Sequence, residues 1–461
     1  MFMQKTTVWL ISILFSATTF SAAADTMLVG VAKVDITPDF PIRLAGYSSR
    51  KDEAREVAGR LWAKALAIGG DEGRGPLVLV TIDNCTVPTQ GVSTVGSRLR
   101  SRAGVRRERF VVCATHTHSA PRLQKNRKQY WYSSTPEHQE HIARYTRQLG
   151  QWIEEVAFSA LAARKPARLA WTQGSLDFAA NRRVLRDGKW IGFGVNPDGP
   201  VDKNMPLLRV TDADGKLMAV LVNYACHCTT LGGKFNQIHG DWAGSAQKEI
   251  EADHPGAIAM VSIGCGADAN PNPRGSLDDA AKHGRSVADE VNRLLLTKLI
   301  SLDSLPRARD TLVKLPLATL PTRNEIVRRI ETTDPDAKLG AHARDMLRLV
   351  DRDGKLPSSI EYRVTVWSFG DRLAMIFLPG EVVVDYSLRL KRELDGSRLW
   401  LTAYANDVPC YIASKRLLSE GGYEADQSML FDGFPTRLSP KAEDRLLGGI
   451  RELVPPSFNR R

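Results

Sequence analysis

Two histidines spaced one residue apart are the most chemically informative feature of this sequence. His116 and His118 lie in Thr-His-Thr-His-Ser, directly after the strand-like run Phe110–Ala114. Because residues two apart in a strand face the same side, both imidazoles can point into one pocket at a strand end. Such a pair is typical of a metal site, and structural or surface histidines are the alternative.

Three further segments carry groups that could join the same pocket. His227 ends an expected strand, and Glu381 lies in the strand-to-helix turn Leu-Pro-Gly-Glu. Residues 263–272 run from a strand into a loop rich in glycine and amide side chains, whose N–H groups could stabilise an oxyanion. Each has an ordinary alternative: a core histidine, a capping glutamate and a simple turn.

The elements that must position these groups alternate between strands and helices. Strands are expected at residues 28–36, 76–82, 110–114, 167–172 and 257–263, with hairpins over 207–223 and 362–378. Helices are expected at 137–164, at 277–300, after residue 381 and at 341–350. Strands interleaved with helices, together with antiparallel hairpins, predict an α/β fold, a mixed layered domain of sheets and helices.

Composition excludes some classes of protein and leaves others open. The chain has 461 residues, 43% of them hydrophobic, which is enough for a large core, and its body holds no apolar run of membrane-spanning length. The formal charge is 63 − 52 = +11, without a nucleic-acid-binding motif. We therefore expect no nucleic-acid partner, and consider solvated basic surface or peripheral contact with an anionic membrane or glycan surface.

The N-terminus is typical of an export signal. Lys5 precedes an apolar stretch at 8–20 and small residues at 21–24, which predicts a signal peptide over residues 1–24 with cleavage near Ala24. A short membrane anchor is the alternative. The mature chain, 25–461, would then be periplasmic or secreted. Its six cysteines are expected to be structural thiols with at most one disulfide.

The ordered set of motifs resembles the neutral, non-lysosomal ceramidases. It comprises Asp-Ile-Thr-Pro at 35–38, Thr-His-Thr-His-Ser at 115–119, Asn-Tyr-Ala-Cys-His at 223–227, Pro-Gly-Glu at 379–381 and Asn-Asp-x-x-x-Tyr at 406–411. The resemblance covers residues 29–433 and implies the catalytic-domain fold of that family with one zinc ion per chain. Its ligands would be His116, His227, Glu381 and Tyr411.

The resemblance also implies roles for residues around the metal. His118 corresponds to a histidine beside the ligands that faces the substrate. Arg182 corresponds to an arginine near the bound amide, and Tyr423 to a tyrosine that hydrogen-bonds the reacting carbonyl.

The chain departs from the family pattern in three places. Asn270 stands where the family has its nucleophilic serine, and Ala-Pro-Arg at 120–122 replaces a glycine-rich continuation. The chain stops at residue 461, so we expect a single zinc hydrolase domain over 25–461 without the family's C-terminal immunoglobulin-like domain.

These features lead to one functional hypothesis and two alternatives. The hypothesis is an exported zinc-dependent hydrolase of an amide or ester bond in a small acylated substrate, a lipid or an acyl sugar, with zinc-bound water as nucleophile. His118 would transfer a proton, Arg182 and Tyr423 would stabilise the oxyanion, and Asn270 would donate a hydrogen bond. The alternatives are a true ceramidase and a non-catalytic zinc-dependent binding protein. Whether residues 306–357 form a lid is left open.

Overall fold

The computed structural model describes residues 26–460 except 73, 126, 127, 129, 131–133, 335 and 336. The expected signal peptide lies outside the described residues. Across the part that is described, every helix is too short or too polar to cross a bilayer.

The strands and helices follow one another along the chain in the mixed order that the sequence predicts. The strands are β1 Met27–Asp35, β2 Trp62–Ile68, β3 Leu77–Ile82, β4 Phe110–Ala114, β5 Lys165–Ser175, β6 Ala179–Arg186, β7 Lys189–Asn196, β8 Asn204–Asp212, β9 Leu217–Tyr224, β10 Ile258–Ile263, β11 Ala269–Pro271, β12 Ile300–Ser301, β13 Arg307–Pro316, β14 Ser359–Phe369, β15 Leu373–Phe377, β16 Glu381–Val382, β17 Leu399–Thr402 and β18 Tyr411–Ile412. The α-helices are α1 Thr89–Ala103, α2 Pro136–Ala162, α3 Asp241–Asp253, α4 Leu277–Leu295, α5 Arg323–Thr332, α6 Lys338–Asp353, α7 Val384–Glu393, α8 Lys415–Glu420, α9 Ser428–Phe431 and α10 Lys441–Leu453.

Two sheets form the centre of the molecule. The larger runs in the order β10-β9-β8-β5-β1-β2-β3-β4, with β12 added beside β5, and the smaller in the order β13-β14-β15-β17. The pairs β3–β4 and β9–β10 are parallel, whereas β1–β2 and β8–β9 are antiparallel. This mixture confirms the expected mixed α/β fold.

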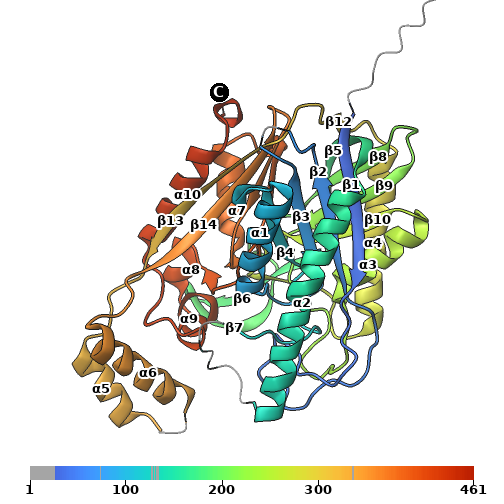
Figure 1. The fold of residues 1–461 in the computed structure, drawn as a ribbon. Coiled ribbons are helices and arrows are strands. Elements are labelled where there is room, and N and C mark those ends of the chain that lie inside the picture. The colour runs from blue at the N-terminus through green and yellow to red at the C-terminus, as the bar shows by residue number, and fades with distance from the viewer. Residues whose placement is uncertain are drawn as a thin grey trace, which may run out of the picture.

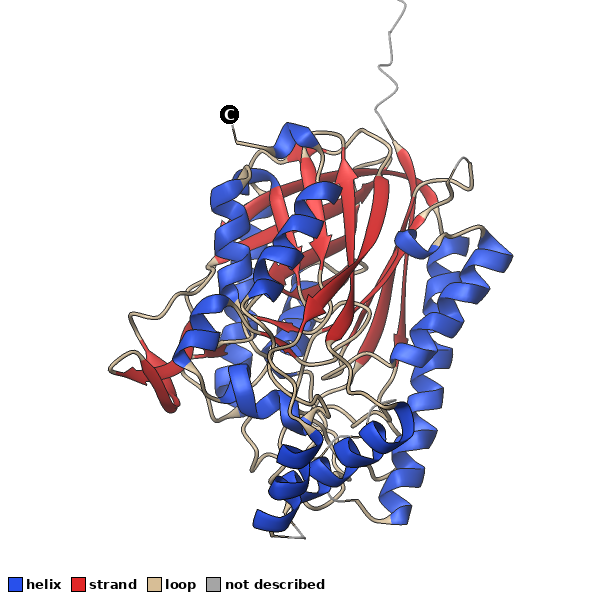
Figure 2. Cartoon of the chain, turned by 90° about the vertical axis from the view of Figure 1, so that its left-hand side faces the viewer, coloured by secondary structure: helices blue, strands red, loops and turns tan. Residues whose placement is uncertain are grey.

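Side-chain alternation along the strands builds two cores, one on each face of the large sheet. On β3, Val78 and Val80 point into a core shared with helix α2, while Leu77 and Leu79 point into a second core. The second core also contains Trp367 and other side chains of the smaller sheet, so the two sheets pack face to face. Helices cover the outer faces, with α2 beside β1–β3 and α10 beside β13–β14 (Figures 1 and 2).

Several element boundaries differ from expectation by a few residues, among them the ends of α4 and β9. Helix α4 ends at Leu295 and not at residue 300, because the N–H groups of Leu296 and Thr297 turn back to the carbonyls of Arg293 and Leu294 and close it. Strand β9 ends at Tyr224, so His227 lies in the following loop and not on the strand.

Candidate metal centre

His116 is placed by a turn that follows the parallel strand β4. Its N–H donates to the carbonyl of Asn84, and its φ of 58° lies in the left-handed region. Nδ1 lies 2.6 Å from the carbonyl oxygen of Cys85, so that nitrogen carries the proton and donates it. Nε2 therefore keeps its lone pair. The expectation that strand alternation aims this side chain was wrong, because β4 ends at Ala114.

His227 is held in a matching way from the other end of the large sheet. Its backbone N–H donates to the carbonyl of Ala269, and its carbonyl accepts from the indole N–H of Trp242. Nδ1 lies 3.1 Å from the carbonyl oxygen of Gly266 and donates to it. The lone pair of Nε2 thus faces His116, whose ring centroid is 4.7 Å away.

Glu381 and Tyr411 are brought together by a short parallel bridge. Strands β16 and β18 pair these two residues directly. Oε2 of Glu381 lies 3.2 Å from Nε2 of His227 and 3.3 Å from Nε2 of His116. The hydroxyl of Tyr411 accepts from Nη2 of Arg182 at 3.1 Å. All four sequence-predicted metal ligands are thus close together.

The donor set fits a divalent metal ion. Two imidazole Nε2 atoms and a carboxylate oxygen converge at a buried point, which is unfavourable unless a positive charge lies among them. That charge can be a metal ion, or a proton on His116, because burial lowers the pKa of His116 but Cys85 and Glu381 together raise it to about 10. Burial opposes ionisation of Glu381, but His116 and His227 hold its pKa well below the usual value, so it is a carboxylate at neutral pH. Burial and the charge of Arg182 lower the pKa of His227 to about 3, which keeps that ring neutral. Nitrogen and oxygen donors of this kind suit zinc.

A second group of donors, Cys85, His116 and His118, also lies within metal-binding distance. Here Sγ of Cys85 faces Nδ1 of His116 at 3.8 Å, and that nitrogen already donates to the Cys85 carbonyl. On the side of Cys85, His116 therefore presents a protonated nitrogen. The set with His227 and Glu381 is the better site.

His118 lies beside the proposed ligands, with its Nε2 3.1 Å from Nε2 of His116. Burial, reinforced by the neighbouring imidazoles His116 and His227, lowers its pKa well below the usual value. A neutral imidazole that close to the centre can accept a proton and pass it on.

Arg182 projects from β6 into the same site and is fixed by a buried ion network. Its Nε donates to Glu424 at 2.9 Å, and Glu424 also pairs with Arg183, which is fully buried and bonded to Glu420. Nη1 of Arg182 reaches to 3.4 Å from Nε2 of His227. The network holds the guanidinium in one orientation, aimed at the centre.

Asn270 and Tyr423 complete the set of predicted residues. Oδ1 of Asn270 accepts from Oγ1 of Thr229 at 3.1 Å and from Nη1 of Arg182 at 3.5 Å, which leaves its amide N–H₂ as the donor. Tyr423 packs edge-on against Tyr411 with ring centroids 5.5 Å apart. Burial, with Glu381 nearby, raises the pKa of Tyr423, so its hydroxyl stays protonated and can donate.

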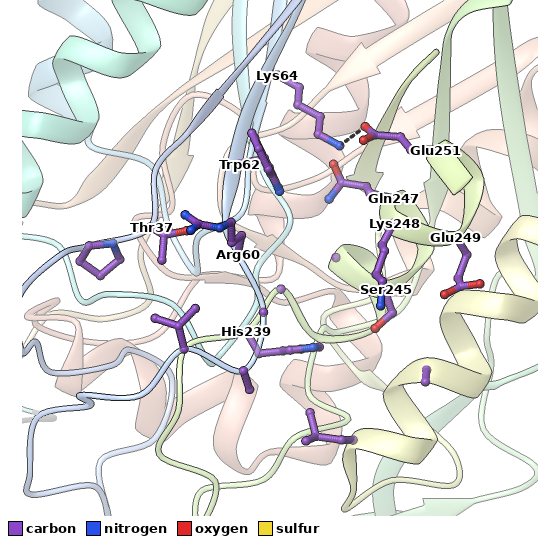
Figure 3. A pocket seen from close by; sticks show the side chains of 18 of the residues that line it. Thr37, Arg60, Trp62, Lys64, His239, Ser245, Gln247, Lys248, Glu249 and Glu251 are labelled. Atoms are coloured by element: carbon purple, nitrogen blue, oxygen red, sulfur yellow. Dashed lines mark hydrogen bonds and ion pairs between the residues drawn. The ribbon is translucent and has the colours of Figure 1, made fainter. Parts of the chain in front are cut away.

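These side chains line one cavity of about 410 Å³, which includes the predicted residues His116, His118, Arg182, Asn270, Glu381, Tyr411 and Tyr423. A larger cavity of about 980 Å³ lies between the β1–β2 connection and helix α3 (Figure 3). There Lys64 is paired with Glu251, and Gln247 donates to Asp83. None of the four proposed ligands lines the larger cavity, so the smaller one is the candidate site.

Some residues at the site carry no signal in the sequence. Tyr404 stacks on His116 with ring centroids 4.2 Å apart, and Tyr47 packs edge-on against His118 at 4.9 Å. A tyrosine two residues before Asn406 could have drawn attention to the first, whereas nothing in the sequence marks the second. Among the described residues that line the cavity, none comes from the 306–357 segment. The six cysteines are buried and unpaired.

The fold and the site define a layered α/β protein with a candidate mononuclear metal centre at the strand ends. The sequence matches the family model described as neutral/alkaline non-lysosomal ceramidase, N-terminal, over residues 27–277. This match covers more than half of the chain, which therefore belongs to the neutral/alkaline non-lysosomal ceramidase family and confirms the resemblance seen in its motifs.

Individual relatives agree with this assignment. The chain is 28% identical to neutral ceramidase of Pseudomonas aeruginosa over 253 residues, and 25% identical to neutral ceramidase B of Dictyostelium discoideum over 266. Each match covers 54% of this chain but only 37% and 36% of those proteins. The crystal structure of the Pseudomonas enzyme has a TM-score of 0.71 and 20% identity, covering 95% of this chain and 76% of that one. That likeness shows a shared fold.

We expect Glu381→Gln to weaken zinc binding by about a hundredfold or more, because it removes the only carboxylate between the two imidazoles within the described site. Calorimetric titration of the metal-free protein with zinc measures the dissociation constant. Glu361→Gln, an exposed glutamate on β14, is the matched control. Unchanged affinity in Glu381→Gln would contradict the ligand assignment.

Asp268, which joins the site loop to helix α7, makes stability depend on pH. It accepts from the N–H of Val384 at 2.9 Å and from Arg416 at 3.2 Å. Burial, with Asp385 nearby, raises its pKa to about 6 from 3.8. The folded state therefore holds a proton between pH 4 and 6 that the unfolded state has lost, so this contribution to stability falls as pH rises through that window.

Between pH 4 and pH 7 we expect the unfolding free energy of Asp268→Asn to rise by about 2 kcal/mol relative to that of the unsubstituted protein, because the amide cannot ionise. Urea unfolding at a series of pH values measures the difference. A difference that stays constant across this range, or that falls, would show that Asp268 ionises freely in the folded state.

Proposed function

We propose that the chain is an exported zinc-dependent hydrolase of an amide or ester bond in an N-acyl or O-acyl compound, with water as the nucleophile. The observation that carries the proposal is the convergence of two Nε2 lone pairs, of His116 and His227, on Oε2 of Glu381 in an open cavity. Family membership supports the reaction class. The export signal expected at residues 1–24 supports the location.

Zinc bound to His116, His227, Glu381 and Tyr411 would polarise a carbonyl and lower the pKa of water to about 7. The chain's own groups do the rest. Nη1 of Arg182 and the hydroxyl of Tyr423 can hydrogen-bond the carbonyl oxygen as negative charge develops on it. His118, neutral at rest, can take a proton from water and deliver it to the leaving nitrogen or oxygen.

Asn270 explains why water is proposed and not a side chain. An amide nitrogen is a poor nucleophile, and the Oδ1 of Asn270 is engaged by Thr229 and Arg182. The amide N–H₂ can donate to the substrate instead. Among the described residues that line the cavity, the serines are Ser48 and Ser49, neither of which bonds to an imidazole that could activate it.

Two other functions predict different behaviour at this site. A true ceramidase would use the same groups on ceramide, and the relatives named as ceramidases favour it. A zinc-dependent binding protein would need the ligands alone. The ion network that aims Arg182, and the position of His118, favour catalysis because neither is needed to hold a metal.

The test is hydrolysis by the purified mature chain of a panel of ceramide, other N-acyl amines and O-acyl esters, with zinc content measured on the same samples. We expect one zinc per chain, loss of hydrolysis after chelation and recovery when zinc is restored. Rapid quenching and mass spectrometry should find no acyl group on the protein. A stable acyl adduct would contradict the water nucleophile, and zinc-loaded protein inert on all substrates would favour the binding function.

A further inference from the structure

The rim of the candidate site carries an excess of positive charge. The charged residues that line the cavity are Arg122, Lys125, Arg182, Arg274, Glu381 and Asp432. Arg182 is paired with Glu424, and Glu381 faces the two imidazoles. The other charged residues of the lining are Arg122, Lys125, Arg274 and Asp432.

Two of these cations use only neutral partners in the described structure. Nζ of Lys125 donates to the carbonyl of Val408 at 2.9 Å, and Nη2 of Arg274 donates to the hydroxyl of Tyr47 at 3.0 Å. Neither makes an ion pair with a described carboxylate. Both keep donor groups and full charge available at the mouth of the cavity.

Arg274 lies on the side of the site where the leaving group would depart. It is bonded to Tyr47, whose ring packs edge-on against His118, the proposed proton donor to that group. The charge of Asp432 acts on Tyr423. An anion on the leaving group would meet the guanidinium of Arg274 beside Tyr47.

The apolar part of the rim is formed by other residues. Phe193 lines the cavity and packs edge-on against Tyr423, with centroids 5.0 Å apart. It is 53% exposed and lies two residues from both Ile191 and Val195 on β7, which are also about half exposed. This stripe suits an acyl chain.

Both local departures from the family motifs lie in this cavity. Arg122 belongs to the Ala-Pro-Arg sequence that replaces a glycine-rich continuation, and Asn270 replaces the serine; each lines the pocket. Because both changes, at Arg122 and at Asn270, lie in one cavity, we attribute them to a different substrate and not to general divergence of the fold.

We propose that the leaving group of the substrate carries an oxyanion, a carboxylate or a phosphate, bound by Arg274 and Lys125 with Arg122 nearby. The acyl chain lies along Phe193. The inference rests on the proposed function, and it names the substrate class as acyl compounds of acidic amines or alcohols, such as N-acyl amino acids. Charge-assisted hydrogen bonds to a guanidinium and an ammonium provide the selectivity.

The test compares binding of unreactive analogues to the zinc-loaded mature chain by calorimetry. N-dodecylsulfonyl glycine, its ethanolamine counterpart and the phosphoethanolamine counterpart share one chain and differ in headgroup charge, and none has a carbonyl to hydrolyse. We expect the glycine or phosphate compound to bind at least about tenfold more tightly than the neutral one, with the advantage shrinking as salt is raised. If the phosphoethanolamine compound binds most tightly, the preferred headgroup is a phosphate. If the glycine compound binds most tightly, the preferred headgroup is a carboxylate.

Substitutions assign the preference to the rim. Arg274→Gln and Lys125→Gln should each reduce the ratio of anionic to neutral affinity several-fold, whereas Arg445→Gln, an exposed arginine on α10, should not. Thermal unfolding checks that each variant is folded. If one rim variant does not fold, the other is sufficient to test whether the rim causes the preference.

Equal affinity for charged and neutral headgroups, or a preference for the neutral one, would overturn the inference. Its failure is distinguishable from failure of the proposed function. Selective binding without hydrolysis of any substrate would reject the hydrolase, whereas zinc-dependent hydrolysis without anion selectivity would reject only the oxyanion.

Discussion

The structure depends on a single electrostatic constraint, the meeting of two imidazole lone pairs and a carboxylate in a buried space. The backbone carbonyls of Cys85 and Gly266 each accept a hydrogen bond from Nδ1 of one ring, which turns Nε2 of His116 and of His227 toward Oε2 of Glu381. A positive charge at its centre, from a metal ion or from a proton on His116, stabilises this arrangement. The site is therefore a candidate cation-binding site in which backbone carbonyls orient the two imidazole side chains.

The fold brings these groups together because strands from separate parts of the chain end, or begin, beside the same site: β4 before His116, β9 before His227 and β16 at Glu381. The segment 403–406 links the sheets, because the N–H of Ala403 donates to Ile263 and that of Asn406 to Val112. This arrangement requires strained backbone close to the site, since the φ values of His116, Tyr404 and Asn406 are 58°, 54° and 65°. Positive φ at non-glycine residues persists only where surrounding contacts fix it, and here those contacts are the two sheets.

Much of this was predictable from sequence, and for physical reasons. Alternating and continuous apolar runs predict β3, β4 and β10 closely, because strands buried on both faces must be apolar throughout. The ordered motifs predicted His116, His227, Glu381 and Tyr411, which the structure brings together. The turn that aims His116 was not predictable, since its left-handed backbone is fixed by contacts with Asn84 and Cys85 far away in sequence. The same holds for Tyr47 and Arg274, whose roles exist only once the rim of the cavity is assembled.

The most direct test of the central claim is X-ray absorption at the zinc edge on the zinc-loaded protein. We predict a first coordination shell of nitrogen and oxygen at about 2.0–2.1 Å, with the scattering pattern of two imidazoles and no sulfur. A sulfur scatterer at about 2.3 Å would mean that Cys85 binds the metal. The centre formed by His116, His227 and Glu381 would then be wrong.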